Sequence, residues 1–141
     1  PDNTTRYQAN LRQLSNRITA LAATIKAELY DNQRPFITYH DAYQYFEDEY
    51  RLNHIESISF DEEAGISLKH LQRIKALIDN NEIRCLIYQP PKPDIVDTLT
   101  SQTRITAFSL DPLGLTLQDD KDAWFQIMAN TAKNFSLCLA D

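Results

Sequence analysis

Residues 85–88 read Cys-Leu-Ile-Tyr, and this unbroken apolar run decides the fold class. A strand with one face in water alternates apolar and polar residues, whereas a strand buried on both faces is apolar throughout. Helical patterns flank the run, because residues 67–78 repeat apolar side chains at helical spacing and residues 94–101 form a second helix after a proline-rich turn at 90–93. A buried strand between two helices is typical of a parallel sheet that helices cover on both faces.

The pattern continues outward in both directions along the chain. Residues 36–39 form a short β-prone run, residues 54–60 alternate with period two, and a short helix over 43–50 separates these two predicted strands. A fourth strand is predicted over 105–110 and a last helix over about 121–139. This alternation of strands and helices predicts an α/β fold with a four-stranded, mostly parallel sheet flanked by helices.

One long helix is predicted ahead of the sheet, from Thr4 to about Tyr30. Its apolar residues recur at intervals of three and four and mark a single stripe: Tyr7, Leu11, Leu14, Ile18, Leu21, Ile25 and Leu29. A helix of about 27 residues spans about 40 Å, which is longer than one small domain needs. We therefore expect residues 1–31 to be a connecting helix and residues 32–141 to form the α/β lobe.

Composition excludes several classes of protein. The 141 residues include 14 Lys and Arg against 20 Asp and Glu, a formal net charge of −6, and they show no basic cluster. This balance argues against nucleic acid and anionic membranes as partners. The chain has only two glycines, Gly65 and Gly114, which nearly excludes a glycine-rich phosphate-binding loop. No apolar run approaches the roughly 20 residues of a membrane-spanning helix.

Residues that bind metals in other proteins follow two of the predicted strands. His40 and Asp41 come directly after the strand at 36–39, and Asp111 follows the strand at 105–110 in an Asp-Pro-Leu-Gly turn. Open α/β sheets bind ligands at the carboxyl ends of their strands. If these strand ends are neighbours, an imidazole and a carboxylate there offer nitrogen and oxygen ligands to a borderline metal such as zinc. The alternative is that His40 caps the next helix and Asp111 only forms a turn.

The remaining histidines are predicted to have no role in metal binding. His70 lies off the apolar stripe of its helix, so we expect it to be solvated. His54 opens a strand at the end away from the carboxyl edge, so we expect it to be structural or exposed.

The two cysteines, Cys85 and Cys138, allow one intramolecular pairing. Neither belongs to a C-x-x-C pair, which disfavours a redox site or a zinc knuckle. Two unrelated buried thiols and one structural disulfide in an oxidising compartment are both compatible with the sequence.

Several motifs together resemble one family. Residues 36–46 are similar to the F-x-x-x-H-D-A-Y-x-Y-F segment of zinc-uptake substrate-binding proteins of the ZnuA type, which serve ABC transporters, and residues 111–114 are similar to the late D-P-L-G turn of that family. The segment from Tyr7 to Leu11 resembles the start of the helix that joins the two lobes of these proteins. The resemblance runs over essentially the whole chain, with the elements in the family's order.

The resemblance implies a transport function and no enzymatic one. It assigns His40 and Asp111 to a zinc ion, with Asp41 orienting the imidazole or its loop, and it implies a disulfide between Cys85 and Cys138. It also implies a periplasmic protein that delivers zinc to the membrane permease of an ABC transporter. The chain begins at Pro1, so we expect it to be the C-terminal lobe with the connecting helix, without the N-terminal lobe. It departs from the family at Gln89, where a glutamate is common.

Two other interpretations remain open at this point. A related solute-binding protein of the manganese or iron type would share the fold, although such proteins favour a carboxylate at the position of His40 and harder oxygen ligands. A small α/β domain with no metal role would use His40 and Asp111 as an acid–base pair or merely as turn residues.

Overall fold

The computed structural model describes residues 3–30, 32–59, 67–118 and 120–140. Five helices and four strands alternate along these residues, and all four strands are parallel. In chain order the elements are α1 (Thr4–Glu28), β1 (Pro35–His40), α2 (Gln44–Tyr50), β2 (Asn53–Ser59), α3 (Leu68–Asn80), β3 (Cys85–Tyr88), α4 (Asp94–Gln102), β4 (Thr106–Ser109) and α5 (Ala123–Cys138). The predicted α/β class is therefore confirmed, with element boundaries that differ from the expected ones by a few residues.

The strands lie in the order β2-β1-β3-β4. The chain passes from β1 outward to β2 and then returns across β1 to β3, so the direction of winding reverses between β1 and β3. In open α/β sheets a crevice forms at such a reversal, outside the carboxyl ends of the strands. His40 is the last residue of β1 and therefore lies beside this crevice.

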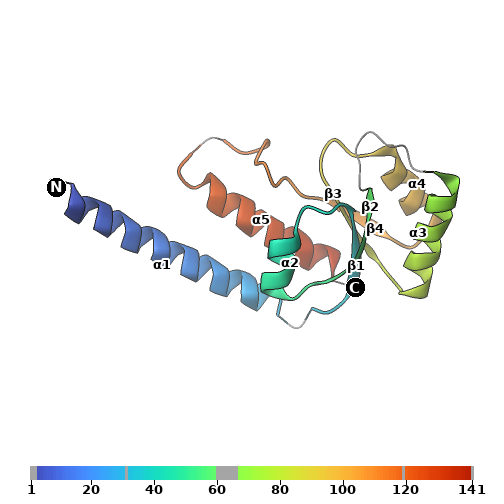
Figure 1. Ribbon diagram of the computed structural model, residues 1–141, viewed down its shortest axis with the longest axis horizontal. Coiled ribbons are helices and arrows are strands. Elements are labelled where there is room, and N and C mark those ends of the chain that lie inside the picture. The colour runs from blue at the N-terminus through green and yellow to red at the C-terminus, as the bar shows by residue number, and fades with distance from the viewer. Residues whose placement is uncertain (1–2, 31, 60–66, 119, 141) are drawn as a thin grey trace.

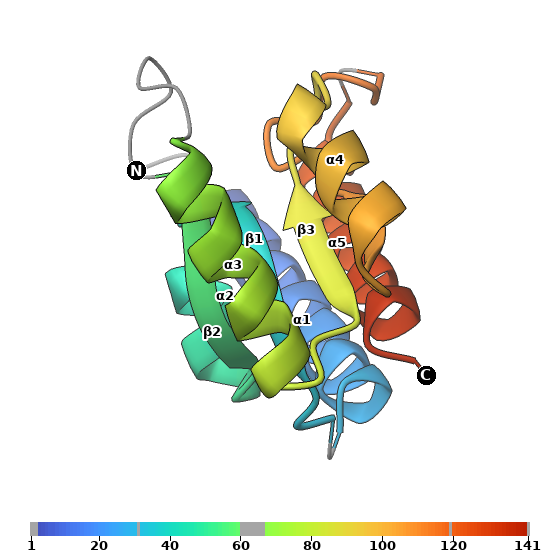
Figure 2. The same ribbon diagram turned by 90° about the vertical axis from the view of Figure 1, so that its right-hand side faces the viewer.

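Alternate residues of the two central strands face opposite layers of helices. Phe36 of β1, with Cys85 and Ile87 of β3, faces the side that α1, α2 and α5 cover. Ile37 and Leu86 face the side that α3 and α4 cover. Figures 1 and 2 show these two layers, with α3 and α4 together on one side of the sheet. Residues 85–87 of the apolar run are thus buried from both faces, as the sequence predicts, whereas Tyr88 at the end of the strand is half-buried.

Helix α1 is buried only near its C-terminal end, where Ile25 contributes to the core. Farther toward its N-terminus the helix runs along α5, where the guanidinium of Arg17 lies 2.5 Å from a carboxylate oxygen of Asp122 and 3.9 Å from the ring centroid of Phe125. The first turns extend past the rest of the molecule (Figure 1). Their apolar stripe is exposed at Tyr7, Leu11, Leu14 and Ile18.

A disulfide joins Cys85 in β3 to Cys138 at the end of α5, with 5.2 Å between the two Cα atoms. The sequence was compatible with two free thiols or with a disulfide, and the structure contains the disulfide. It attaches the last helix covalently to a central strand of the sheet.

Candidate metal site

His40 stands at the carboxyl end of β1, half-buried, where the strand gives way to the loop before α2. The ring of Tyr39 meets the His40 ring edge to face, with 4.4 Å between the centroids. The backbone carbonyl of His40 accepts a hydrogen bond from the backbone N–H of Ala42 at 3.1 Å. This contact turns the chain sharply after the strand, so the position of the imidazole is determined by the strand and not by a long loop.

Asp41 follows His40 and is exposed. Its Oδ2 accepts a hydrogen bond from the side-chain amide of Gln44 at 2.8 Å, which links the loop to the first residue of α2. The suggested role of Asp41, orientation of the His40 loop, stays a prediction.

Asp111 follows β4 in a turn that its own carboxylate holds. One oxygen accepts a hydrogen bond from the backbone N–H of Leu115 at 3.0 Å. The other accepts two bonds at 2.8 Å, from the backbone N–H and the hydroxyl of Thr116. Partial burial raises the pKa of Asp111, but these hydrogen bonds from Thr116, Leu115 and Gly114 outweigh burial and lower it below the usual range. The carboxylate is therefore ionised at neutral pH, as a metal ligand must be.

The strands that carry His40 and Asp111 are not neighbours, which corrects the expectation of adjacent strand ends. Strand β3 lies between β1 and β4, so the two strand axes are about 9.6 Å apart at the usual spacing. Gln89 follows β3 and stands at the intervening position. The sequence pattern predicted each strand but carried no information on the order in which the strands pair.

Other residues connect the two strand ends across this gap. Burial is the main cause that raises the pKa of Tyr43 to about 12. The negative charges of Glu47 and Asp111 raise this pKa further, whereas the side chain of Gln89 lowers it. Tyr43, three residues after His40, therefore lies within electrostatic reach of Asp111. A cavity of about 480 Å³ is lined by both Ala42 and Pro112, which follow closely after the two predicted ligands in the chain.

The other histidines have structural partners. His54 is half-buried, in agreement with the structural role expected for it, and its ring contacts Glu47 and Thr38. The prediction for His70 was wrong, because this residue is half-buried and its Nε2 lies 2.8 Å from the carbonyl oxygen of Ile58. Its helix begins beside the end of β2, and a helical periodicity cannot show which polar residue will meet a strand end.

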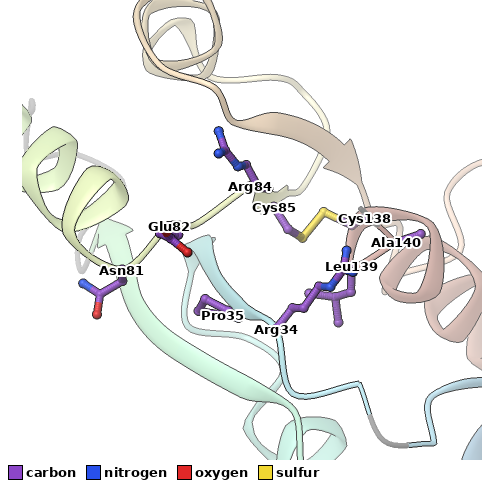
Figure 3. A pocket seen from close by; sticks show the side chains of 9 residues that line it. All are labelled: Arg34, Pro35, Asn81, Glu82, Arg84, Cys85, Cys138, Leu139 and Ala140. Carbon is purple, nitrogen blue, oxygen red and sulfur yellow. A yellow bond between two sulfur atoms is a disulfide. The ribbon is translucent and has the colours of Figure 1, made fainter.

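A second cavity, of about 310 Å³, opens at the opposite edge of the sheet. Figure 3 shows it between the starts of β1 and β3, with Pro35, Arg34, Arg84 and the Cys85–Cys138 disulfide around it. None of the predicted metal-binding residues lines this cavity. The amino-terminal edge is thus separate from the edge that carries His40 and Asp111.

Comparison with known proteins agrees with this architecture. A solved structure described as the crystal structure of ZnuA has a TM-score of 0.79 and 22% sequence identity, and the match covers 99% of this chain and 50% of that one. The Zn(II)-bound E280Q variant of AdcAII from Streptococcus pneumoniae has a TM-score of 0.77 at 18% identity, with 99% of this chain and 51% of that one covered. These likenesses define the class of the chain by its fold, which is the fold of about half of each of these two proteins.

Sequence comparison assigns the chain to one family of proteins. The family described as "ZnuA: Zinc-uptake complex component A periplasmic" matches residues 1–138, and the chain belongs to this family. The high-affinity zinc uptake system protein ZnuA of Haemophilus ducreyi is 33% identical over 139 residues, which cover 98% of this chain and 43% of the relative. That of Brucella suis is 31% identical over 142 residues, which cover 99% of this chain and 42% of the relative. The chain thus spans about two-fifths of the length of these relatives.

Proposed function

We propose that this chain is the zinc-binding C-terminal lobe of a periplasmic protein that captures zinc and delivers it to the permease of an ABC transporter. Its relatives are named for high-affinity zinc uptake, and the matching family is described as periplasmic. The observation that supports the proposal is that an imidazole at the end of β1 and an ionised carboxylate after β4 stand at the same edge of the parallel sheet. Among the described residues, no helix is both long and apolar enough to cross a membrane.

His40 and Asp111 would bind the zinc ion directly. A neutral imidazole and a carboxylate are both ordinary zinc ligands, whereas manganese prefers a set of oxygen ligands. The imidazole of His40 therefore favours zinc over manganese as the cargo. No bond of the cargo is made or broken apart from those to its ligands, so the protein needs no catalytic residue.

Two ligands are fewer than the four that zinc usually takes in proteins. We propose that a second lobe of the same protein supplies the others across the crevice beside β1 and β3. Two observations support this arrangement. The chain spans about two-fifths of its relatives, and the exposed apolar stripe of α1, from Tyr7 to Ile18, offers a surface that a further domain would bury.

Zinc titration of this chain and three variants tests the proposal. His40→Ala and Asp111→Asn each remove one proposed ligand, and Asp79→Asn removes an exposed carboxylate near the C-terminal end of α3, away from both proposed ligands. We expect the first two to weaken zinc binding at this site at least about tenfold and the third to have no effect. Unchanged affinity in both ligand variants would exclude the site. Nanomolar affinity of this chain alone would exclude the need for a second lobe, and a preference for Mn²⁺ in the same titration would overturn zinc as the cargo.

A further inference from the structure

Glu47 is a buried acid on the inner face of α2, with a side chain only 9% exposed. Its Oε2 lies 3.1 Å from Nδ1 of His54. Its other oxygen, Oε1, is inaccessible to solvent and has no hydrogen-bond partner among the described residues. A buried carboxylate oxygen without a partner has lost its hydration and gained no hydrogen bond in return, so such an atom indicates a missing ligand.

His54 is held so that one ring nitrogen points at this carboxylate. Its Nε2 lies 3.1 Å from the hydroxyl oxygen of Thr38 and 3.4 Å from that of Ser57. Its ring stacks on Phe36, with 5.2 Å between the centroids. A metal-binding histidine characteristically uses one nitrogen for the metal and fixes the ring through the other. Thr38 and Ser57 fix Nε2, so Nδ1 is the nitrogen available to an ion next to Glu47.

Asp41 completes a three-residue cluster from the solvent side. Ligand atoms of Asp41, Glu47 and His54 all lie within 4.8 Å of one another. Zinc bonds of about 2.0–2.1 Å in a tetrahedron place ligand atoms roughly 3.4 Å apart, so a small movement of one side chain closes the cluster around an ion. Asp41 is exposed on a loop, so this movement requires only that its exposed hydrogen bond from Gln44 be exchanged, and it leaves the two inner ligands open to solvent.

We propose that Asp41, Glu47 and His54 form a second binding site for a divalent cation of the zinc type, separate from the pair His40 and Asp111. Two carboxylates balance the charge of the ion, and the neutral imidazole supplies the nitrogen ligand that zinc favours. On binding, the metal takes the place of the proton between Nδ1 and the Glu47 carboxylate, and that proton leaves to solvent. The positive charge of the ion then also lies next to Oε1, the oxygen that has no hydrogen-bond partner among the described residues. A water molecule or a chloride ion fills the fourth position.

The second site lies close to the proposed cargo ligand. Thr38, which contacts His54, precedes His40 by two residues in β1, or about 7 Å along the strand, and alternate strand residues face the same side. An ion held by Asp41, Glu47 and His54 therefore lies near the end of β1, on the side of the sheet that Thr38 and His40 share. Such a site would raise the local concentration of zinc beside the crevice.

Cobalt(II) titration of the chain, followed by visible absorption, tests the second site by itself. The double variant His40→Ala/Asp111→Asn removes the first pair of ligands, and we expect it still to bind one Co²⁺ with the intense bands of a four- or five-coordinate ion. Adding Asp41→Asn, a surface change that leaves the core intact, should weaken this binding at least about tenfold, and adding His54→Gln should abolish it. Asp79→Asn on the same background serves as the matched control and should change nothing.

A histidine-selective NMR spectrum of the double variant with Zn²⁺ provides a readout that a purely structural role would not move. We expect the Nδ1 resonance of His54 to shift on addition of the metal while that of His70 stays in place. If the double variant binds no metal, or if Asp41→Asn leaves its affinity unchanged, the cluster is only an ion pair and the proposal is wrong. Circular dichroism of each variant distinguishes the loss of a ligand from the loss of the fold. If His54→Gln fails to fold, the result for Asp41→Asn alone decides whether the second site exists. Neither result bears on whether His40 and Asp111 bind the cargo.

Discussion

Oδ2 of Asp111 lies 2.8 Å from the backbone nitrogen of Thr116 and 2.8 Å from its hydroxyl oxygen. The carboxylate thus closes its own loop before any ligand arrives. Each oxygen of a carboxylate has two lone pairs, and the two contacts use both of those on Oδ2. The capacity to bind a cation therefore rests on Oδ1, which accepts the backbone N–H of Leu115. The turn therefore presents a negative charge in a fixed position, which lowers the reorganisation that metal binding would require.

We expect Thr116→Val to raise the pKa of Asp111, because the substitution removes the hydroxyl donor and keeps the backbone donors. Thr116→Ser retains a hydroxyl and should leave the pKa close to its wild-type value. NMR titration of the Asp111 carboxyl carbon measures both. Because the folded pKa of Asp111 is lowered, its contribution to stability is present at neutral pH and is lost as the pH falls through that pKa. Equal pKa values in the two variants would contradict the role assigned to the hydroxyl.

Gly114 occupies the same turn with φ of +68°, in the left-handed region. A Cβ at this position would lie 2.8 Å from Cδ1 of Ile127. We expect Gly114→Ala to lower the free energy of unfolding by about 1–2 kcal/mol through backbone strain, with the contact to Ile127 adding to this. Leu113→Ala, at an exposed position of the same turn, is the matched control and should have little effect. Urea denaturation measures both, and equal stability of the two variants would show that the turn tolerates a side chain.

The sequence was most informative where a short stretch determines its own structure. Residues 85–87 are buried on both faces because their apolar run has no polar side to turn to water, and Ser67 caps α3 through its side chain as its type and position predict. Pairing across long separations could not be predicted in this way. Whether Cys85 bonds to Cys138 depends on the distance between β3 and the end of α5, which no local pattern encodes.

The candidate site shows the same limit. The motif identified His40 and Asp41, but not that β3 separates β1 from β4. The contact between Glu47 and His54 depends on how α2 packs on the sheet and on the irregular register of β1 and β2 near Phe36. The available signal in the sequence was Thr38, a polar residue in the middle of the β-prone run Phe36–Tyr39.

The ion pair of Glu47 and His54 makes the stability of the metal-free protein depend on pH. Burial lowers the pKa of His54, but the hydrogen bond and charge of Glu47, helped by the backbone of Glu56 and the charge of Asp41, outweigh burial and raise the pKa above the usual value. A raised folded pKa stabilises the protein fully below the unfolded pKa of about 6.5, and this contribution is lost as the pH rises through the folded value.

Glu47→Gln should therefore destabilise the protein most at mildly acidic pH, by about 1.5–3 kcal/mol for a hydrogen bond to a charged partner. The difference from the wild type should shrink as the pH rises toward 8. Urea denaturation across this range, with a chelator present, measures the effect. Glu49→Gln, an exposed change on the same helix, is the control and should show no such trend. A pH-independent difference for Glu47→Gln would show that the pair is not charged.

The Cys85–Cys138 disulfide should supply a large part of the stability of the domain. Its two residues are 53 positions apart in the chain, and closing a loop of this length stabilises the fold by about 4 kcal/mol in the chain-entropy model. We expect the reduced wild type to unfold at a lower urea concentration than the oxidised wild type, with identical side chains in the two samples. The variant Cys85→Ala/Cys138→Ala should unfold near the reduced protein and be insensitive to reductant. Similar midpoints for the oxidised and reduced protein would mean that packing of α5 through Phe135 holds the helix without the bond. A contribution of this size would make the fold depend on an oxidising compartment, which is the condition that a periplasmic location provides.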